Sequence, residues 1–80
     1  MATRGWRIPD DVLSLCHIEA CDRQRQALLD RFGVHQSNYG ANPPGPVDLA
    51  ARDRAEARLL RETRRRKRIF EAMMERARHG

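Results

Sequence analysis

Large apolar side chains are scarce in this chain. Leu, Ile, Val and Phe together account for 15 of its 80 residues. This share lies just under the level of about 20% below which a highly charged chain is suspected of disorder. Even a well-packed chain of this length buries only about 60% of the surface that it exposes when unfolded. We therefore expect one small domain whose burial is completed by dimerisation or by a partner protein.

The chain also lacks the features of a secreted or membrane-bound protein. Its two cysteines, Cys16 and Cys21, cannot form a disulfide framework, and on one helix their Cβ vectors diverge, so we expect them to be reduced. No apolar run approaches the roughly 20 residues of a membrane span. Residues 1–11 contain no apolar core of a signal peptide. The sequence favours an intracellular, reducing compartment, the cytoplasm first, with an organelle or the nucleus as alternatives.

No motif predicts catalysis or a bound cofactor. The chain has no Gly-rich phosphate loop after a strand, no Ser/His/Asp arrangement and no carboxylate pair in an apolar setting. His17 and Cys21 are one helical turn apart, a workable pair for a soft metal. Cys16 points away from Cys21, however, so a cluster of three ligands is not expected. We predict no enzymatic activity, no metal site, no cofactor and no small-molecule substrate.

Helix start and stop signals predict an all-α fold, a two-helix antiparallel hairpin. Pro9 and Asp10 are typical of a helix start, and Gly33 is typical of a left-handed C-terminal cap. Prolines and glycines then predict a long nonhelical link. The expected segments are an arm at residues 1–8, a helix at 10–32, a link at 33–46 and a long basic helix at 47–78.

The two predicted helices have different faces. The first is apolar around most of its circumference, so we expect contacts on more than one of its sides. On the second helix, Arg66 and Lys67 divide the apolar side into two patches at residues 49–60 and 69–77. A first helix of about 23 residues is too short to cover both patches. A dimer in which each patch meets a different chain would solve this.

Positive charge is concentrated in the second half of the chain. The net charge is +5, and residues 47–80 carry all of it. Five arginines follow a 4, 3, 4, 3 spacing that keeps them on one side of a helix, and Arg64 flanks them. The five are Arg54, Arg58, Arg61, Arg65 and Arg68. Arginine suits bidentate contacts to phosphates and carboxylates, and a merely solvated face is the alternative. The candidate polyanion-binding or acidic-partner-binding residues are Arg54, Arg58, Arg61, Arg64, Arg65 and Arg68.

Two functions from different classes fit these patterns. The first is a protein-interaction module, such as an inhibitor, an adaptor or an accessory subunit of a larger assembly, which binds another protein or a second copy of itself. The alternative is a helical hairpin that binds RNA or DNA through its phosphates. The scarcity of core residues and the long link favour the first function, and the charge asymmetry favours the second. The residues expected to pack on a partner are Trp6, Leu59, Phe70, Met73 and Met74.

Overall fold

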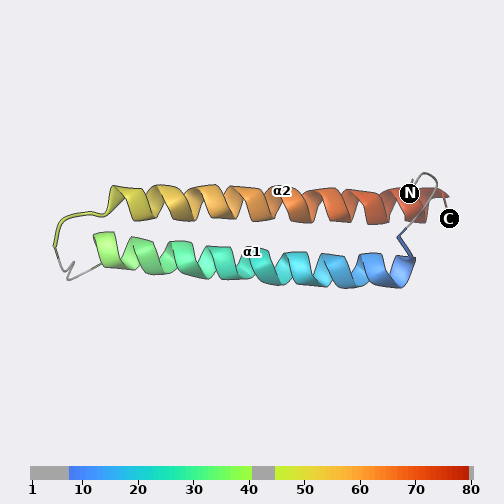
Figure 1. The fold of residues 1–80 in the computed structure, drawn as a ribbon, viewed down its shortest axis with the longest axis horizontal. Helices are drawn as coiled ribbons and strands as arrows, with labels where there is room; N and C mark the ends of the chain where they lie inside the picture. Colours follow the sequence, from blue (N-terminus) through green and yellow to red (C-terminus); the bar gives the residue numbers. More distant parts are fainter. Residues whose placement is uncertain (1–7, 41–44, 80) are drawn as a thin grey trace, which may run out of the picture.

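Two long helices make up the structure, which is a computed structural model and describes residues 8–40 and 45–79. The helices are α1 (Asp10–Tyr39) and α2 (Leu49–His79), and the described residues contain no strand. They lie side by side and antiparallel along their whole length (Figure 1). The all-α prediction is confirmed, and α2 agrees with its predicted bounds within two residues. Neither helix has a stretch that is long and apolar enough to cross a membrane.

The predicted end of the first helix at residue 32 is wrong, because α1 continues through Gly33 to Tyr39. A glycine inside a helix costs about 1 kcal/mol relative to alanine. The continuation brings Asn38 into hydrogen-bonding contact with Asp48, a long-range contact that opposes this local cost. The helix ends instead at Gly40, whose backbone is extended and whose N–H donates to the Gln36 carbonyl at 2.9 Å.

The longer α1 also removes the expected mismatch between the two helices. With 30 residues in α1 and 31 in α2, the helices have nearly equal lengths of about 45 Å. Both apolar patches of α2 therefore lie opposite α1 of the same chain. The prediction that the first helix covers only one patch is wrong, and it depended on the misplaced helix end.

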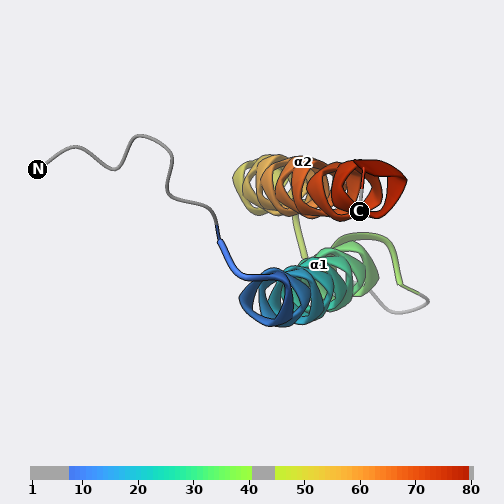
Figure 2. The ribbon, with the colours of Figure 1, turned by 90° about the vertical axis from the view of Figure 1, so that its right-hand side faces the viewer.

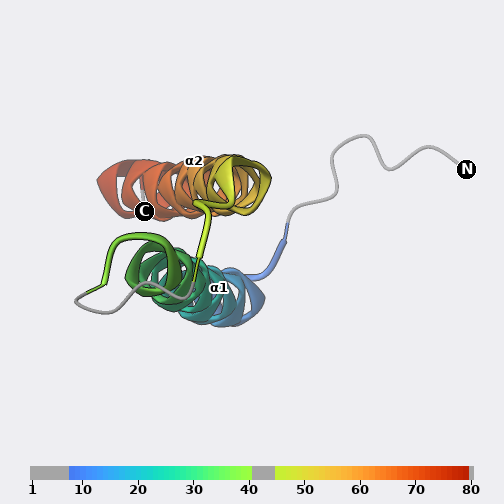
Figure 3. The ribbon, with the colours of Figure 1, turned by 90° about the vertical axis from the view of Figure 1, so that its left-hand side faces the viewer.

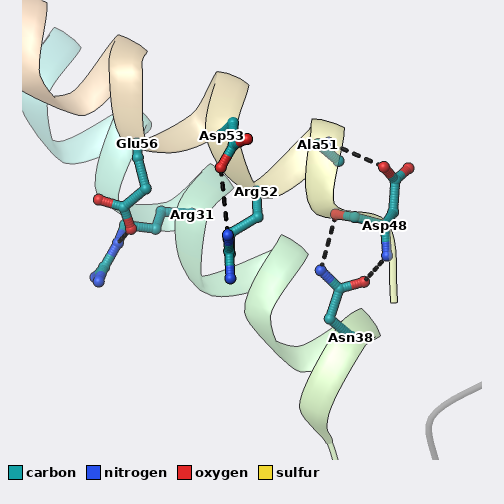
Figure 4. Close-up of polar contacts among 7 residues, drawn as sticks. All are labelled: Arg31, Asn38, Asp48, Ala51, Arg52, Asp53 and Glu56. Carbon is teal, nitrogen blue, oxygen red and sulfur yellow. Dashed lines mark hydrogen bonds and ion pairs between the residues drawn. The ribbon is translucent and has the colours of Figure 1, made fainter. Parts of the chain in front are cut away.

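Asn38 closes the hairpin at the link (Figure 4). Its side chain is buried, with 7% of its surface exposed. The Asn38 amide nitrogen donates to the Asp48 carbonyl at 3.1 Å, and its amide oxygen accepts from the Asp48 N–H at 2.9 Å. The Asp48 carboxylate in turn accepts a hydrogen bond from the Ala51 N–H at 2.9 Å and caps the start of α2. One side chain thus positions the residue that begins the second helix.

The face between the helices, here called the interhelical face, follows the alternating 3 and 4 spacing of a coiled coil. Small and polar side chains occupy much of it, and two of those on α1 reach neighbouring residues of α2: Gln24 donates to Thr63 at 3.1 Å, and His17 packs on Phe70. The buried apolar residues among those described are Leu13, Ala20, Ala27 and Ala55. On α1 the face comprises Leu13, His17, Ala20, Gln24, Ala27, Arg31, Val34 and Asn38, and on α2 it comprises Ala55, Leu59, Glu62, Arg66, Ile69, Met73 and Arg76.

Because the hairpin is a single layer, the outer half of each helix is uncovered (Figures 2 and 3). Its radius of gyration is 17.8 Å, whereas a compact domain of this length would have about 12 Å. The exposed large apolar residues are Val12, Leu15, Ile18, Leu28, Leu29, Phe32, Tyr39, Val47, Leu49, Leu60, Phe70 and Met74. More large apolar side chains are exposed than buried, so this fold offers surface for a partner.

Replacing Gly33 with alanine should stabilise the protein. A Cβ atom at this position meets nothing within 4 Å, and alanine in a helix interior is favoured over glycine by about 1 kcal/mol. Thermal unfolding followed by circular dichroism should show a midpoint about 4–8 °C higher. Gly40→Ala is the opposing control, because its Cβ would lie 2.4 Å from the Gln36 carbonyl oxygen, and it should lower the midpoint. A destabilised Gly33→Ala variant would contradict the helical placement of Gly33.

Replacing Asn38 with alanine should destabilise the hairpin by about 1–2 kcal/mol, because two hydrogen bonds to Asp48 are lost together. Urea unfolding at a fixed protein concentration measures this change. The neighbouring Ser37 is exposed and serves as the matched control. Ser37→Ala should leave the free energy of unfolding unchanged or slightly higher. Equal effects of the two substitutions would show that the contact between Asn38 and Asp48 does not hold the link.

Candidate functional site

Arg58 and Arg65, two of the six predicted binding arginines, form ion pairs with acids of α1. Arg58 donates to the Asp30 carboxylate, and Arg65 donates to the Glu19 carboxylate at 3.1 Å. The antiparallel arrangement places these acids opposite this side of α2. We expected the arginines to face an acidic surface on a partner, and α1 of the same chain supplies part of that surface. The charge that Arg58 and Arg65 offer to any other partner is reduced accordingly.

The other four predicted arginines face outward. Arg54, Arg61, Arg64 and Arg68 are exposed, and none of them has an ion pair with any described residue. Arg54, Arg61 and Arg68 are spaced by seven residues, so they form a line of about 21 Å along the helix. We call these four residues the outward arginines. Together with the exposed Lys67, they hold the outward positive charge of α2 that no described acid compensates.

A broad, open depression lies beside three of these arginines, Arg61, Arg64 and Arg68. Its volume is about 740 Å³. It is too open to enclose a small substrate, but its lining presents several guanidinium groups to one extended anion. The lining residues are Arg23, Arg61, Arg64, Arg65, Lys67 and Arg68, together with the acids Glu62 and Glu71.

Arg66 and Lys67, which interrupt the apolar side of α2 in the sequence, have different surroundings. Lys67 is exposed, as expected for a long side chain that extends to solvent. Arg66 is half-buried on the interhelical face, and its Nε atom is buried without a hydrogen-bond partner among the described residues. An unpaired buried donor costs stability. Arg66 therefore makes the contact between the helices weaker than an apolar residue would.

The residues predicted to pack on a partner do not share one surface. Leu59 and Met73 are half-buried on the interhelical face, so much of their surface is used within the hairpin. Phe70 packs on His17 with a ring-centroid distance of 5.7 Å and keeps 44% of its surface exposed, and Met74 is also exposed. Trp6 lies outside the described residues. Their contact with a partner stays a prediction.

A line of apolar residues on the outer side of α1 was not among the predicted binding residues. Leu15, Ile18, Leu29 and Phe32 are 57–65% exposed and lie opposite the interhelical face. Their positions continue a second alternating 3 and 4 spacing, in which Asp22 and Arg25 occupy the middle. We call these six residues the outer stripe. The same spacing rule that identifies the interhelical face would have found it in the sequence.

The ionisable groups give little sign of chemistry. The Cys21 sulfur lies 3.8 and 3.9 Å from the two ring nitrogens of His17, and both cysteines are free. Within residues 8–40 and 45–79, no three His, Cys, Asp or Glu side chains are grouped closely enough to hold a metal ion. A hydrogen bond to Tyr39 and the negative charge of Asp53 raise the pKa of Arg52. Arg52 therefore stays charged at any physiological pH.

Comparisons with known proteins do not add to this description. No protein-family model matches the chain. Searches among curated proteins and among solved structures likewise gave no match. The function must therefore be inferred from the two surfaces that the hairpin leaves uncovered. These are the outer stripe of α1, which is mainly apolar, and the outward arginines of α2, which are basic.

Proposed function

We propose that this protein is a non-enzymatic protein-interaction module that docks through the outer stripe of α1. The observation that carries this proposal is the exposure of Leu15, Ile18, Leu29 and Phe32 along one line of a helix. Large apolar side chains that recur at this spacing are the signature of a helix that packs on another helix. The inner side of α1 is already occupied by α2, so the outer stripe is available to a partner.

The four side chains of the outer stripe alone do not offset the cost of association. Complete burial of a Leu, Ile or Phe side chain contributes about 1.5–3 kcal/mol, so burying the exposed part of the four side chains contributes roughly 4–7 kcal/mol. Association itself costs about 4–15 kcal/mol in lost translational and rotational freedom. The partner must therefore add apolar groups of its own, and the complex should depend on protein concentration.

The proposal predicts a protein complex that depends on the outer stripe. A tagged chain is purified after nuclease treatment from cells that also produce a copy with a second tag. We expect a protein, either another chain or the second copy, to be retained by the wild type and lost with Leu29→Glu or Phe32→Glu. The measurement is the amount of retained protein per tagged chain on a stained gel, followed by its mass.

Leu60→Glu is the matched control for this experiment. Leu60 is 50% exposed, which is close to the outer stripe residues, but it lies on α2. This variant should retain the partner as the wild type does. If the wild type retains no protein, or if Leu60→Glu and Phe32→Glu lose it equally, the outer stripe is not the docking surface.

Binding of a polyanion, RNA or DNA, is a second candidate function. It is supported by the line of outward arginines and by the depression of about 740 Å³ that Arg61, Arg64 and Arg68 help to line. Phosphate contacts of this kind position a nucleic acid without reading its sequence. The candidate uses α2 and not the outer stripe, so the two functions do not compete for one surface.

A triple Arg61→Gln, Arg64→Gln and Arg68→Gln variant tests this candidate. Fluorescence anisotropy with labelled RNA and DNA should show weaker binding and a salt dependence reduced by about 0.7–0.9 per lost phosphate contact. The opposite change is expected from the double variant Glu19→Gln and Asp30→Asn, which releases Arg65 and Arg58 from their ion pairs. Binding that responds neither to salt nor to these substitutions would exclude phosphate contacts by this side of α2.

A further inference from the structure

The outer stripe has an internal symmetry along α1. Its residues form pairs at equal distances from the midpoint between residues 23 and 24. Leu15 corresponds to Phe32, Ile18 to Leu29, and Asp22 to Arg25. Each pair therefore joins two apolar side chains or two opposite charges.

The same correspondence continues beyond the six residues of the outer stripe. Asp11 corresponds to Gln36, a carboxylate and an amide that can hydrogen bond. All four pairs, from Asp11 to Gln36, are chemically complementary. A surface with this property matches a second copy of itself that is turned end to end.

We propose that the outer stripe binds the outer stripe of a second copy, antiparallel, about a two-fold axis that passes between residues 23 and 24. This inference rests on the proposed function and names its partner. A two-fold interface is isologous, so residue i of one copy contacts residue j of the other, and j contacts i. In this dimer Leu15 packs on the other copy's Phe32, and Ile18 packs on its Leu29.

The charges at the centre select this orientation and this register. Asp22 and Arg25 form an ion pair of 2.5 Å within one chain. In the antiparallel dimer, each of them also meets the opposite charge of the second copy. A parallel dimer would place Asp22 beside Asp22 and Arg25 beside Arg25, which is unfavourable.

A shift of the antiparallel register by one heptad is also unfavourable. Moving the midpoint toward the C-terminal end of α1 places Asp22 opposite Phe32. Moving it toward the N-terminal end places Ile18 opposite Asp22. In both cases a charged group is buried against an apolar side chain without a partner. The register with its midpoint between residues 23 and 24 avoids this.

The distribution of charge between the helices favours contact through α1. Residues 10–39 contain five acids and three arginines, whereas residues 49–79 contain eleven basic residues and five acids. Two copies that met through α2 would bring two strongly basic helices together. Contact through α1 joins two weakly acidic helices, and it leaves both basic helices on the outside.

The size of the contact sets the expected strength of the dimer. Overlap about this axis covers residues 10–37, or about 42 Å of helix. A helix about 10 Å wide then contributes a footprint of about 400 Å² per copy, roughly half that of a standard stable interface. The dimer should therefore be concentration-dependent, with dissociation in the micromolar range.

Charge exchange at the centre tests the proposal with the full chain. Asp22→Arg leaves only positive charges at the centre, and Arg25→Asp leaves only negative ones. Sedimentation velocity over a wide range of protein concentrations should show dimers for the wild type and a dimer dissociation constant raised by about tenfold or more for each variant. An equimolar mixture of the two variants should form a heterodimer, and the double variant Asp22→Arg, Arg25→Asp should dimerise as the wild type does.

Two controls separate loss of the interface from loss of the fold. Circular dichroism should show unchanged helix content in each variant, because Asp22 and Arg25 are exposed. Leu60→Glu, on α2, should dimerise as the wild type does. Restored dimer formation in the mixture cannot arise from misfolding, because each variant in it carries the substitution that weakens its own homodimer.

Two results would overturn the inference. A wild type that stays monomeric at every concentration would show that the second copy is not the partner. If the wild type is monomeric but retains another protein that Phe32→Glu does not retain, the proposed function still holds. A dimer that neither Asp22→Arg nor Arg25→Asp weakens uses another surface.

Discussion

The contact between α1 and α2 along a single face is the interaction on which the rest of the structure depends. Ala20 and Ala27 are essentially fully buried there, which lets the two helices approach closely. Alanine contributes little apolar surface, however, and Arg66 adds an unpaired buried donor. Neither helix packs on a third element among the described residues. The hairpin is therefore held by a narrow contact, while much of its apolar surface faces solvent.

Ion pairs along the edges of this face fix the orientation of the helices more than they stabilise them. Glu19–Arg65 and Asp30–Arg58 join the helices along one edge, and Arg31 of the interhelical face pairs with Glu56 of α2. Exposed pairs of this kind contribute at most about 1 kcal/mol each. A different alignment of the two helices would separate the two members of each pair. Because acids of α1 pair with the nearest arginines of α2, the basic residues that remain available to a partner are those that point away from α1.

The sequence alone predicted two helices, because start signals and period-3.6 patterns are local properties of the chain. It misplaced the end of α1 because a glycine ends a helix only when no later contact stabilises the helix beyond it. Here the contact of Asn38 with Asp48 stabilises the extra turns of α1, and it joins residues that are distant in the local sequence pattern. The arginine spacing was recognisable, but the division between paired and outward arginines depends on which side of α2 faces α1. The outer stripe was overlooked because apolar residues surround α1, so neither of its sides stood out.

The single-layer architecture gives the two candidate surfaces independent roles. In Figures 2 and 3, α1 and α2 each have one outer side, and these sides point in opposite directions. A partner on the outer stripe of α1 therefore does not cover the outward arginines of α2. In a two-fold dimer through α1, the order of helices is α2, α1, α1 and α2, so both basic sides remain outermost. Such a dimer would present two equivalent basic surfaces. An anion long enough to reach both would bind more tightly, because binding to one surface raises its effective concentration at the other.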